Sequence, residues 1–274
     1  MKKDFVLISQ RNEKIRITTY GSEKAPCLIY VHGFKGFKDW GFVPYSGEYL
    51  SSKGFFVITF NFSHNGIGDY PLEFTELEKF GKNTFSLEIE ELSEVIDAYQ
   101  FNFFGGNTDK GIGLLGHSRG GGIALLTASE KDDVKAAAVW ASVSKLDRYS
   151  KRQKEEWRKK GVFEVLNTRT NQLMPLNISL LDDIEQNKNG KLNLKKAVSE
   201  LNKPLLILHG EQDLAVKIDE GKEIYSWANK ELTESYFIEA AGHTFDIKHP
   251  FEGSNPKFDF VLNKTEEFFT KNLN

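Results

Sequence analysis

The chain has 274 residues, of which 36 are basic and 39 acidic, and its formal net charge is -3. This length suits one large α/β domain, and the near balance of charges excludes the broad positive field that collects nucleic acid. The single cysteine, Cys27, excludes a disulfide framework or a cysteine-based metal site within one chain, and we interpret it as a small buried apolar residue. No apolar run is long enough for a signal-peptide core or a membrane span, so we expect a cytoplasmic protein without a membrane partner.

Short β-rich runs alternate along the chain with longer segments of helical period. This pattern predicts an α/β fold with a mostly parallel sheet and helices on both faces. Residues 5–9 and 14–20 should form an opening antiparallel pair. Six almost continuously apolar runs, as expected of buried parallel strands, follow at 27–33, 55–62, 111–118, 136–142, 204–210 and 235–240. We therefore expect a central sheet of about eight strands.

Apolar residues at steps of three and four predict two amphipathic helices. The apolar stripe of the first consists of Phe85, Ile89, Leu92, Ile96 and Tyr99. The stripe of the second, which should close the sheet, consists of Phe258, Val261, Leu262, Phe268 and Phe269. The first helix also carries Glu88, Glu90, Glu91 and Glu94, which we interpret as a solvated face rather than a metal site.

Two segments interrupt the alternation. Residues 63–83 form a long loop after a strand, and such loops are usually functional. Residues 145–203 are highly charged and contain helix-like pieces but no convincing buried strand. We expect this segment to be a helical lid inserted between two parts of one core, residues 1–144 and 204–274.

Residues 116–120, Gly-His-Ser-Arg-Gly, match the pattern G-x-S-x-G between a predicted strand and a predicted helix. Glycines on either side let strand and helix approach closely, and the strained turn exposes the hydroxyl of Ser118. The helix N-terminus then directs free N–H groups toward an oxyanion formed there. Ser118 is therefore the candidate nucleophile, and a purely structural glycine turn is the alternative.

A serine hydroxyl needs a base to take its proton and a third group to orient that base. Asp213 lies just beyond one predicted strand, and His243 lies in the loop after the next. Asp213 should accept a hydrogen bond from one ring nitrogen of His243 and leave the other nitrogen for Ser118. The sequence thus predicts a catalytic triad of Ser118, Asp213 and His243.

Other residues compete for two of these roles. Glu211 and Asp219 flank the candidate acid, but the first is nearer the turn and the second lies in a helix-like segment. His249 competes with the candidate base and is interpreted as a pocket or surface residue. His64 and His209 have no partner that the sequence identifies.

The oxyanion needs two N–H donors, which we assign to Phe34 and Arg119. Gly33 allows the backbone to turn inward, so that the Phe34 N–H faces the developing charge, while His32 braces the loop. An ordinary strand-ending turn is the alternative. His32 and Lys35 are further candidates for contact with substrate.

The segments "VHGF", "GHSRGG", "HGEQD" and "AGHTF" resemble the α/β-hydrolase superfamily in order and spacing, over nearly the whole chain. Within it, "HGFKGFKDWGF" and "FNFSHNGIGD" resemble small bacterial serine esterases, including cinnamoyl and feruloyl esterase-like proteins, and also acyl-peptidase-like hydrolases. The resemblance implies an α/β-hydrolase fold and ester hydrolysis by the triad and oxyanion hole named above. Lys35 departs from it, because feruloyl-type relatives tend to carry a smaller residue or threonine there.

From these residues we expect a serine carboxylic-ester hydrolase that forms an acyl-enzyme and uses no metal or cofactor. Its partner should be a small to medium acyl or aryl ester, and the resemblance adds hydroxycinnamoyl esters to this class. We expect the protein to be a monomer or homodimer. The predicted lid carries aromatic and cationic residues that either contact an aromatic or anionic acyl group or simply pack and face solvent: Tyr149, Arg152, Trp157, Arg158 and Phe163. Trp157 is the candidate substrate contact among them.

Three alternatives to ester hydrolysis stay open. An aminopeptidase-like enzyme would need an acidic clamp, which Glu73, Glu76 or Glu78 could supply. An acyl-CoA thioesterase would need a basic patch, for which Lys35 and Lys38 are candidates. The third is a non-catalytic interaction protein that has kept the fold, although such proteins usually lose a member of the triad.

Overall fold

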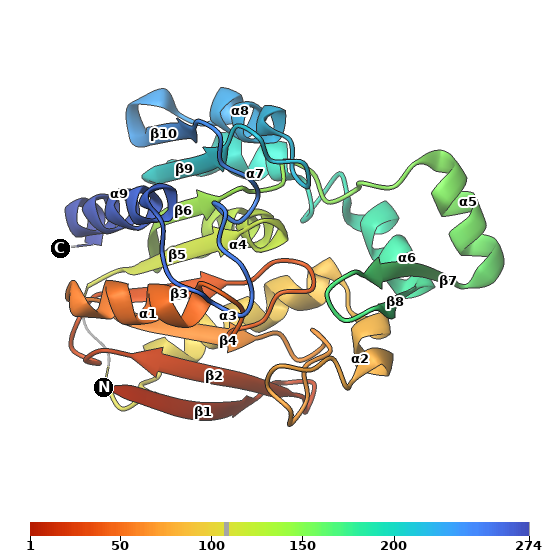
Figure 1. Cartoon of the computed structure of the whole chain (residues 1–274), viewed down its shortest axis with the longest axis horizontal. Helices are drawn as coiled ribbons and strands as arrows, with labels where there is room; N and C mark the ends of the chain where they lie inside the picture. Colours follow the sequence, from red (N-terminus) through yellow and green to blue (C-terminus); the bar gives the residue numbers. More distant parts are fainter. Residues whose placement is uncertain (107–109, 274) are drawn as a thin grey trace.

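The computed structural model describes residues 1–106 and 110–273. Eight strands form one sheet in the order β1-β2-β4-β3-β5-β6-β9-β10 (Figure 1). In chain order these strands are β1 (Lys2–Ile8), β2 (Lys14–Tyr20), β3 (Cys27–Val31), β4 (Phe56–Asn61), β5 (Ile112–His117), β6 (Val134–Trp140), β9 (Leu205–Gly210) and β10 (Thr233–Ile238). The predicted sheet of about eight strands is confirmed.

The sheet is parallel except at one edge. β1 pairs antiparallel with β2, as predicted for the opening pair, and β2 also pairs antiparallel with β4. The strands from β4 to β10 across the sheet pair in parallel. Parallel strands bring their carboxyl ends to one edge, so the loops that follow β3, β5, β9 and β10 meet there.

Helices cover both faces of the sheet, as predicted, and the sheet separates two apolar cores. Beside the sheet these helices are α1 (Val43–Ser52), α3 (Phe85–Gln100), α4 (Arg119–Glu130), α8 (Ile218–Trp227) and α9 (Pro256–Leu273), with a short 3-10 helix η1 (Lys230–Leu232) before β10. One core holds side chains of α3, α4 and α8. The other holds side chains of α1 and α9. The apolar stripes predicted for α3 and α9 are buried in these cores, and Cys27 of β3 is buried as expected.

The chain between β6 and β9 contains α5 (Lys151–Lys160), β7 (Val162–Asn167), β8 (Gln172–Asn177), α6 (Ile178–Asn187) and α7 (Leu194–Glu200). We call residues 145–203 the insertion, and most of it protrudes from one end of the sheet (Figure 1). Besides the helices expected there, strands β7 and β8 form an antiparallel hairpin of their own, which the sequence analysis did not identify. The hairpin lies outside the main sheet and is only partly buried, and therefore lacks the apolar continuity of a core strand.

The long segment at 63–83 is not wholly irregular. It contains α2 (Leu77–Lys82) and a bridge between Ile67 and Phe74. Helix α2 lies against β8 of the insertion (Figure 1). Within the described residues, every helix is too short or too polar to span a lipid bilayer.

Candidate active site

Ser118 lies on a sharp turn between β5 and α4, with φ of 57° and ψ of -124°. The glycines around it permit a close approach of strand, turn and helix. A Cβ at Gly116 would lie 2.4 Å from the carbonyl oxygen of Gly120, and a Cβ at Gly120 would lie 2.2 Å from that of Val31. Real Cβ atoms do not approach backbone so closely, so this turn requires glycine at both positions.

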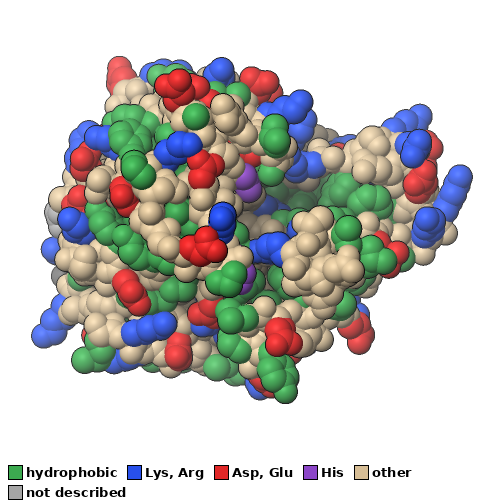
Figure 2. All heavy atoms as spheres, in the orientation of Figure 1, with side chains coloured by type: hydrophobic (Ala, Val, Ile, Leu, Met, Phe, Trp, Pro, Cys, Tyr) green, Lys and Arg blue, Asp and Glu red, His purple; other side chains and the backbone are tan. Residues whose placement is uncertain are grey.

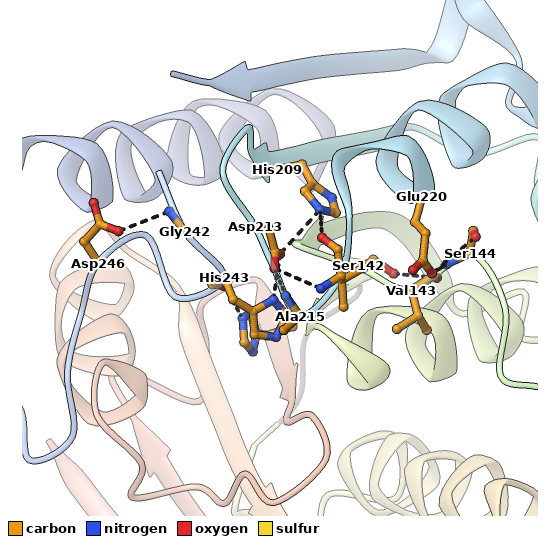
Figure 3. Close-up of polar contacts among 12 residues, drawn as sticks. Ser142, Val143, Ser144, His209, Asp213, Ala215, Glu220, Gly242, His243 and Asp246 are labelled. Atoms are coloured by element: carbon orange, nitrogen blue, oxygen red, sulfur yellow. Dashed lines mark hydrogen bonds and ion pairs between the residues drawn. The ribbon is translucent and has the colours of Figure 1, made fainter. Parts of the chain in front are cut away.

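Asp213 and His243 follow β9 and β10 and form a hydrogen-bonded pair. His243 Nδ1 lies 2.7 Å from Asp213 Oδ2, while the N–H groups of Ala215 and Val216 each donate to Asp213 Oδ1 at 2.8 Å. Figure 3 shows His209 and His243 approaching the same carboxylate. Burial opposes the ionisation of Asp213, but hydrogen bonds from His209 and His243 outweigh it and hold the pKa of this carboxyl well below its usual range. His243 therefore donates from Nδ1, which leaves Nε2 as an acceptor.

Ser118 and His243 line the same two cavities. The first cavity has a volume of about 200 Å³ and is walled by the loop after β3, including Phe34, Phe37 and Trp40. The second cavity has a volume of about 330 Å³ and extends toward the insertion. Within the described part of the chain no hydrogen bond joins the Ser118 hydroxyl to His243; such bonds are often long before substrate binds.

The loop after β3 is braced by His32. Its Nδ1–H donates to the carbonyl of Gly33 at 2.9 Å, and its Nε2 accepts the Phe62 N–H at 3.2 Å. Burial lowers the pKa of His32 to about 4, so the ring is neutral, as this pair of bonds requires. The N–H groups of Phe34 and Arg119 donate to no other group in the described residues. They are thus available for an oxyanion.

The side chain of Arg119 connects the two backbone segments that carry these N–H groups. Its Nη2 lies 2.7 Å from Oε1 of Glu88 on α3, and 11% of the Arg119 side chain is exposed against 1% for Glu88. The guanidinium also lies 4.8 Å from the ring centroid of Phe34 and 5.5 Å from that of Phe85. Asn83 donates a hydrogen bond to the same Glu88 oxygen at 2.7 Å. This cluster fixes the first turn of α4 against the loop after β3.

The prediction that the glutamates of α3 form a solvated face was wrong for two of them. Glu88 and Glu91 are both 1% exposed. Glu91 accepts hydrogen bonds from the N–H and the hydroxyl of Ser63. His64 Nδ1, for which the sequence identified no partner, lies 2.6 Å from the same hydroxyl. These partners come from distant segments, and they make burial of the carboxylates tolerable.

A second histidine, His117, positions His243 and was not singled out by the sequence. Its Nε2–H donates to the backbone carbonyl of His243 at 3.0 Å, and the two rings have centroids 4.8 Å apart. Burial lowers the pKa of His117 to about 3, so it acts as a neutral donor. A histidine at the second position of the G-x-S-x-G pattern was the available signal, but its partner is 126 residues away.

The residues that competed for the acid and base roles lie elsewhere. Glu211 and Asp219 are exposed. His249 Nδ1 accepts the N–H of Gly41 at 2.9 Å and stacks on a tryptophan ring. His209, for which no partner was found in the sequence, is buried and donates to a backbone carbonyl at 2.8 Å beside the carboxylate of Asp213.

The insertion contributes to the two cavities differently from what the sequence suggested. Trp157 is fully buried, packs against Tyr149 and Phe163 at centroid distances of 5.0 and 5.5 Å, and is absent from the described walls of both cavities. Its position favours packing over substrate contact. Arg158 pairs with two acidic residues of α6.

Arg169 is the residue of the insertion that reaches the first cavity, and sequence reasoning missed it. It lies in the turn between β7 and β8, where a lone arginine in a polar loop gives no signal. Lys35, a predicted substrate contact, lines both cavities, and His32 lines the first. Figure 2 shows the hollow between the core and the protruding insertion, with histidine and cationic side chains at its edge.

Comparison with known proteins agrees with this architecture. A family model described as alpha/beta hydrolase fold matches residues 26–183, while no curated protein matches the chain. Two solved structures are similar at 18% identity over 98% of this chain. One is a "putative hydrolase" from Agrobacterium vitis S4 (TM-score 0.75, 99% of that chain), and the other is Est1E from Butyrivibrio proteoclasticus with ferulic acid bound (TM-score 0.74, 98% of that chain). The esterase domain of a Rhodothermus marinus protein is also similar (TM-score 0.67, 18% identity, 100% of both chains). At such identity the likeness shows the fold alone. Because the family model covers more than half of the sequence and the fold agrees from end to end, this chain belongs to the alpha/beta hydrolase fold family.

Proposed function

We propose that this protein is a serine hydrolase of carboxylic esters that works through an acyl-enzyme. The observation that carries the proposal is the 2.7 Å bond between Asp213 and His243, on the wall of a cavity that Ser118 also lines. Three residues that are distant in sequence are thus grouped at one cavity, where Ser118 and His243 line the wall and Asp213 is bonded to His243. The arrangement supplies a nucleophile, a base and an orienting acid.

In the first half of the reaction, Ser118 Oγ attacks the ester carbonyl while His243 Nε2 takes the hydroxyl proton. The scheme requires these two atoms to come into hydrogen-bond reach when substrate binds. The N–H groups of Phe34 and Arg119 receive the negative charge that develops on the carbonyl oxygen. Asp213 stabilises the charged imidazole, which then gives its proton to the departing alcohol.

In the second half, water replaces the alcohol. His243 takes a proton from this water, which attacks the acyl group on Ser118, and the acid is released as the serine recovers its proton. The two cavities hold the parts of the ester on either side of the scissile bond. Their volumes of about 200 and 330 Å³ suit small to medium groups.

Aromatic walls support aryl and hydroxycinnamoyl groups among the substrates. Phe37 and Trp40 line the first cavity, and Phe85 and Tyr149 line the second, while Phe34 lies between the two. Planar acyl groups pack well on such rings. The ferulic acid bound to Est1E in a similar fold supports the same choice.

We also propose that residues 145–203 act as a lid on a core formed by residues 1–144 and 204–274. The insertion leaves the core after β6 and returns before β9, so its removal would not interrupt the sheet order. Its turn at Arg169 and its first residues, including Tyr149, wall the two cavities. A lid in this position would exclude water from the acyl-enzyme.

The alternative activities receive less support. None of the described residues that line either cavity is acidic, which argues against a clamp for a substrate amino group. Glu76 and Glu78 instead pair with lysines of α2. Lys38, one of two candidates for a CoA patch, pairs with Asp39 at 2.8 Å. The complete Asp213 and His243 pair disfavours a non-catalytic role.

The test combines active-site labelling with ester turnover. Wild-type protein should react with a fluorophosphonate probe and hydrolyse nitrophenyl esters. Ser118→Ala should not be labelled, and its kcat should be lower by roughly 10³–10⁶-fold. Ser129→Ala is the matched control, because Ser129 is on the same helix α4 and, among the described residues, its hydroxyl donates to the backbone carbonyl of Leu126 alone. Ester turnover that survives in Ser118→Ala, or an unlabelled wild type, would exclude the scheme.

A further inference from the structure

The turn between β7 and β8 is joined to the loop after β3 by two hydrogen bonds. Arg169 Nη2 donates to the carbonyl of Lys35 at 2.5 Å, and Lys35 Nζ donates to the carbonyl of Leu166 at 3.3 Å. The guanidinium of Arg169 also lies 5.5 Å from the ring centroid of Trp40. Arg169, Lys35 and Trp40 all line the first cavity with Ser118. Two cations from distant segments therefore meet beside the candidate nucleophile.

These two cations lack a counter-charge. In the described part of the chain neither Lys35 nor Arg169 forms an ion pair, and no described residue lining the first cavity is acidic. Two neighbouring cations, which line the second cavity, are neutralised: Arg119 by Glu88 at 2.7 Å, and Arg148 by Glu220 at 2.5 Å. Among the described residues of the first cavity, Lys35 and Arg169 are the lysine and arginine side chains, and neither has such a partner.

The charged forms of both side chains are disfavoured where they lie. Burial, followed by the charge of Arg169, lowers the pKa of Lys35, and burial lowers the pKa of Arg169. Both directions show that the charged forms are held in an environment that disfavours them. An anion placed between them would relieve the repulsion and recover the lost solvation.

Arg169 and Lys35 also have N–H donors that make no hydrogen bond within the described residues. A guanidinium has five N–H donors and an ammonium has three. Each side chain gives one hydrogen bond to a backbone carbonyl in the described structure. The remaining donors can bind both oxygens of a carboxylate, for which the planar guanidinium is well suited.

We propose that the ester hydrolysed at Ser118 carries a free carboxylate, which binds between Arg169 and Lys35 in the first cavity. This inference rests on the proposed ester hydrolysis and adds the class of substrate to it. The carboxylate belongs to whichever part of the ester enters the first cavity, the acid or the alcohol. The second cavity then takes the uncharged part.

Two substrate series test the preference. In the first the acyl group carries the charge: nitrophenyl monoesters of succinic, glutaric and adipic acid are compared with butyrate, pentanoate and hexanoate. In the second the alcohol carries it: the butyrate ester of 4-hydroxybenzoate is compared with that of its methyl ester. Wild type should favour the charged member in at least one series by about tenfold or more in kcat/KM, as a charge-assisted pair implies.

Variants then assign the preference to the two cations. Arg169→Met and Lys35→Met should each reduce the preference for the charged substrate, while Arg169→Lys should retain part of it. Arg152→Met is the matched control, because Arg152 lies on α5 of the same insertion and its side chain is 87% exposed. An equal preference in Arg169→Met and Arg152→Met would overturn the inference.

A binding measurement separates this inference from the proposed function. Calorimetry on Ser118→Ala should detect glutarate but not the neutral glutaramide, and Arg169→Met should weaken the glutarate signal. Failure to bind glutarate or 4-hydroxybenzoate better than their neutral counterparts overturns the carboxylate site, even if neutral esters are hydrolysed. Binding of the anion without any ester turnover would instead exclude the proposed function.

Discussion

Glu88→Gln tests how the turn at Ser118 is held in place. Glu88 and Arg119 are nearly buried, with 1% and 11% of their side chains exposed, and their charged atoms lie 2.7 Å apart. Glutamine keeps the shape of the side chain and an acceptor oxygen, but it removes the negative charge. Because a guanidinium cannot lose its proton in a protein, Arg119 would remain as an uncompensated buried cation.

The expected loss is large compared with the stability of a typical domain. Removing one member of a buried ion pair costs about 3–5 kcal/mol of unfolding free energy, out of a total of roughly 5–15 kcal/mol. Replacing both members of a buried ion pair by uncharged groups is often neutral, because neither charge is then left without a partner. Stability should therefore partly return in the double variant Glu88→Gln, Arg119→Met, which removes both charges.

Thermal unfolding measures this difference. A loss of this size lowers Tm by roughly 6–20 °C, at about 2–4 °C per kcal/mol for a protein of this size. Glu78→Gln is the matched control, because Glu78 pairs with Lys82 on the surface and is 85% exposed, and its Tm should not change measurably. If Glu88→Gln and Glu78→Gln have the same Tm, the buried ion pair does not hold the turn in place.

Three further substitutions test the turn, the acidic helix and the triad. Gly120→Ala should fold poorly or melt far below wild type, because its Cβ would lie 2.2 Å from the Val31 carbonyl oxygen; a native Tm would contradict this geometry. Burial raises the pKa of Glu91 from 4.5 to about 7, so the unfolded chain loses this proton first and stability falls as pH rises through that window. In Glu91→Gln the free energy of unfolding, measured with urea, should no longer fall between pH 4.5 and about 7. An equal dependence of this free energy on pH in both proteins would refute the assignment. Asp213→Asn should keep the fold but lower kcat by about 10⁴-fold, because His243 loses the acceptor that sets its tautomer; near-native ester turnover would exclude that role.

The fold followed from the sequence because its signals are local. Strands buried on both faces appear as continuous apolar runs, and all five residues of Cys27–Val31 are buried. The stripes of α3 and α9 have helical period for the same reason. The order of strands in the sheet, with β4 between β2 and β3, cannot be predicted from the sequence of any single strand. It depends on how the connections cross the sheet.

Periodicity located α3 but could not decide what its acidic face contacts. Glu88 and Glu91 alternate with apolar residues much as solvated glutamates do. What buries them is Arg119 from α4 and Ser63 from the loop after β4. Charge patterns within one helix carry no information about partners from other elements, so composition alone favoured solvent.

The same distinction separates the predicted triad from the missed residue Arg169. Ser118, Asp213 and His243 each follow a strand of one parallel sheet, so the fold itself brings their loops to one edge. Arg169 reaches that edge from a hairpin outside the sheet, and its position depends on how the insertion docks on the loop after β3. The triad could therefore be predicted from sequence motifs, because each of its residues follows the end of a strand. The residues proposed to select the substrate depend on tertiary docking, and only the structure brings Arg169 and Lys35 together.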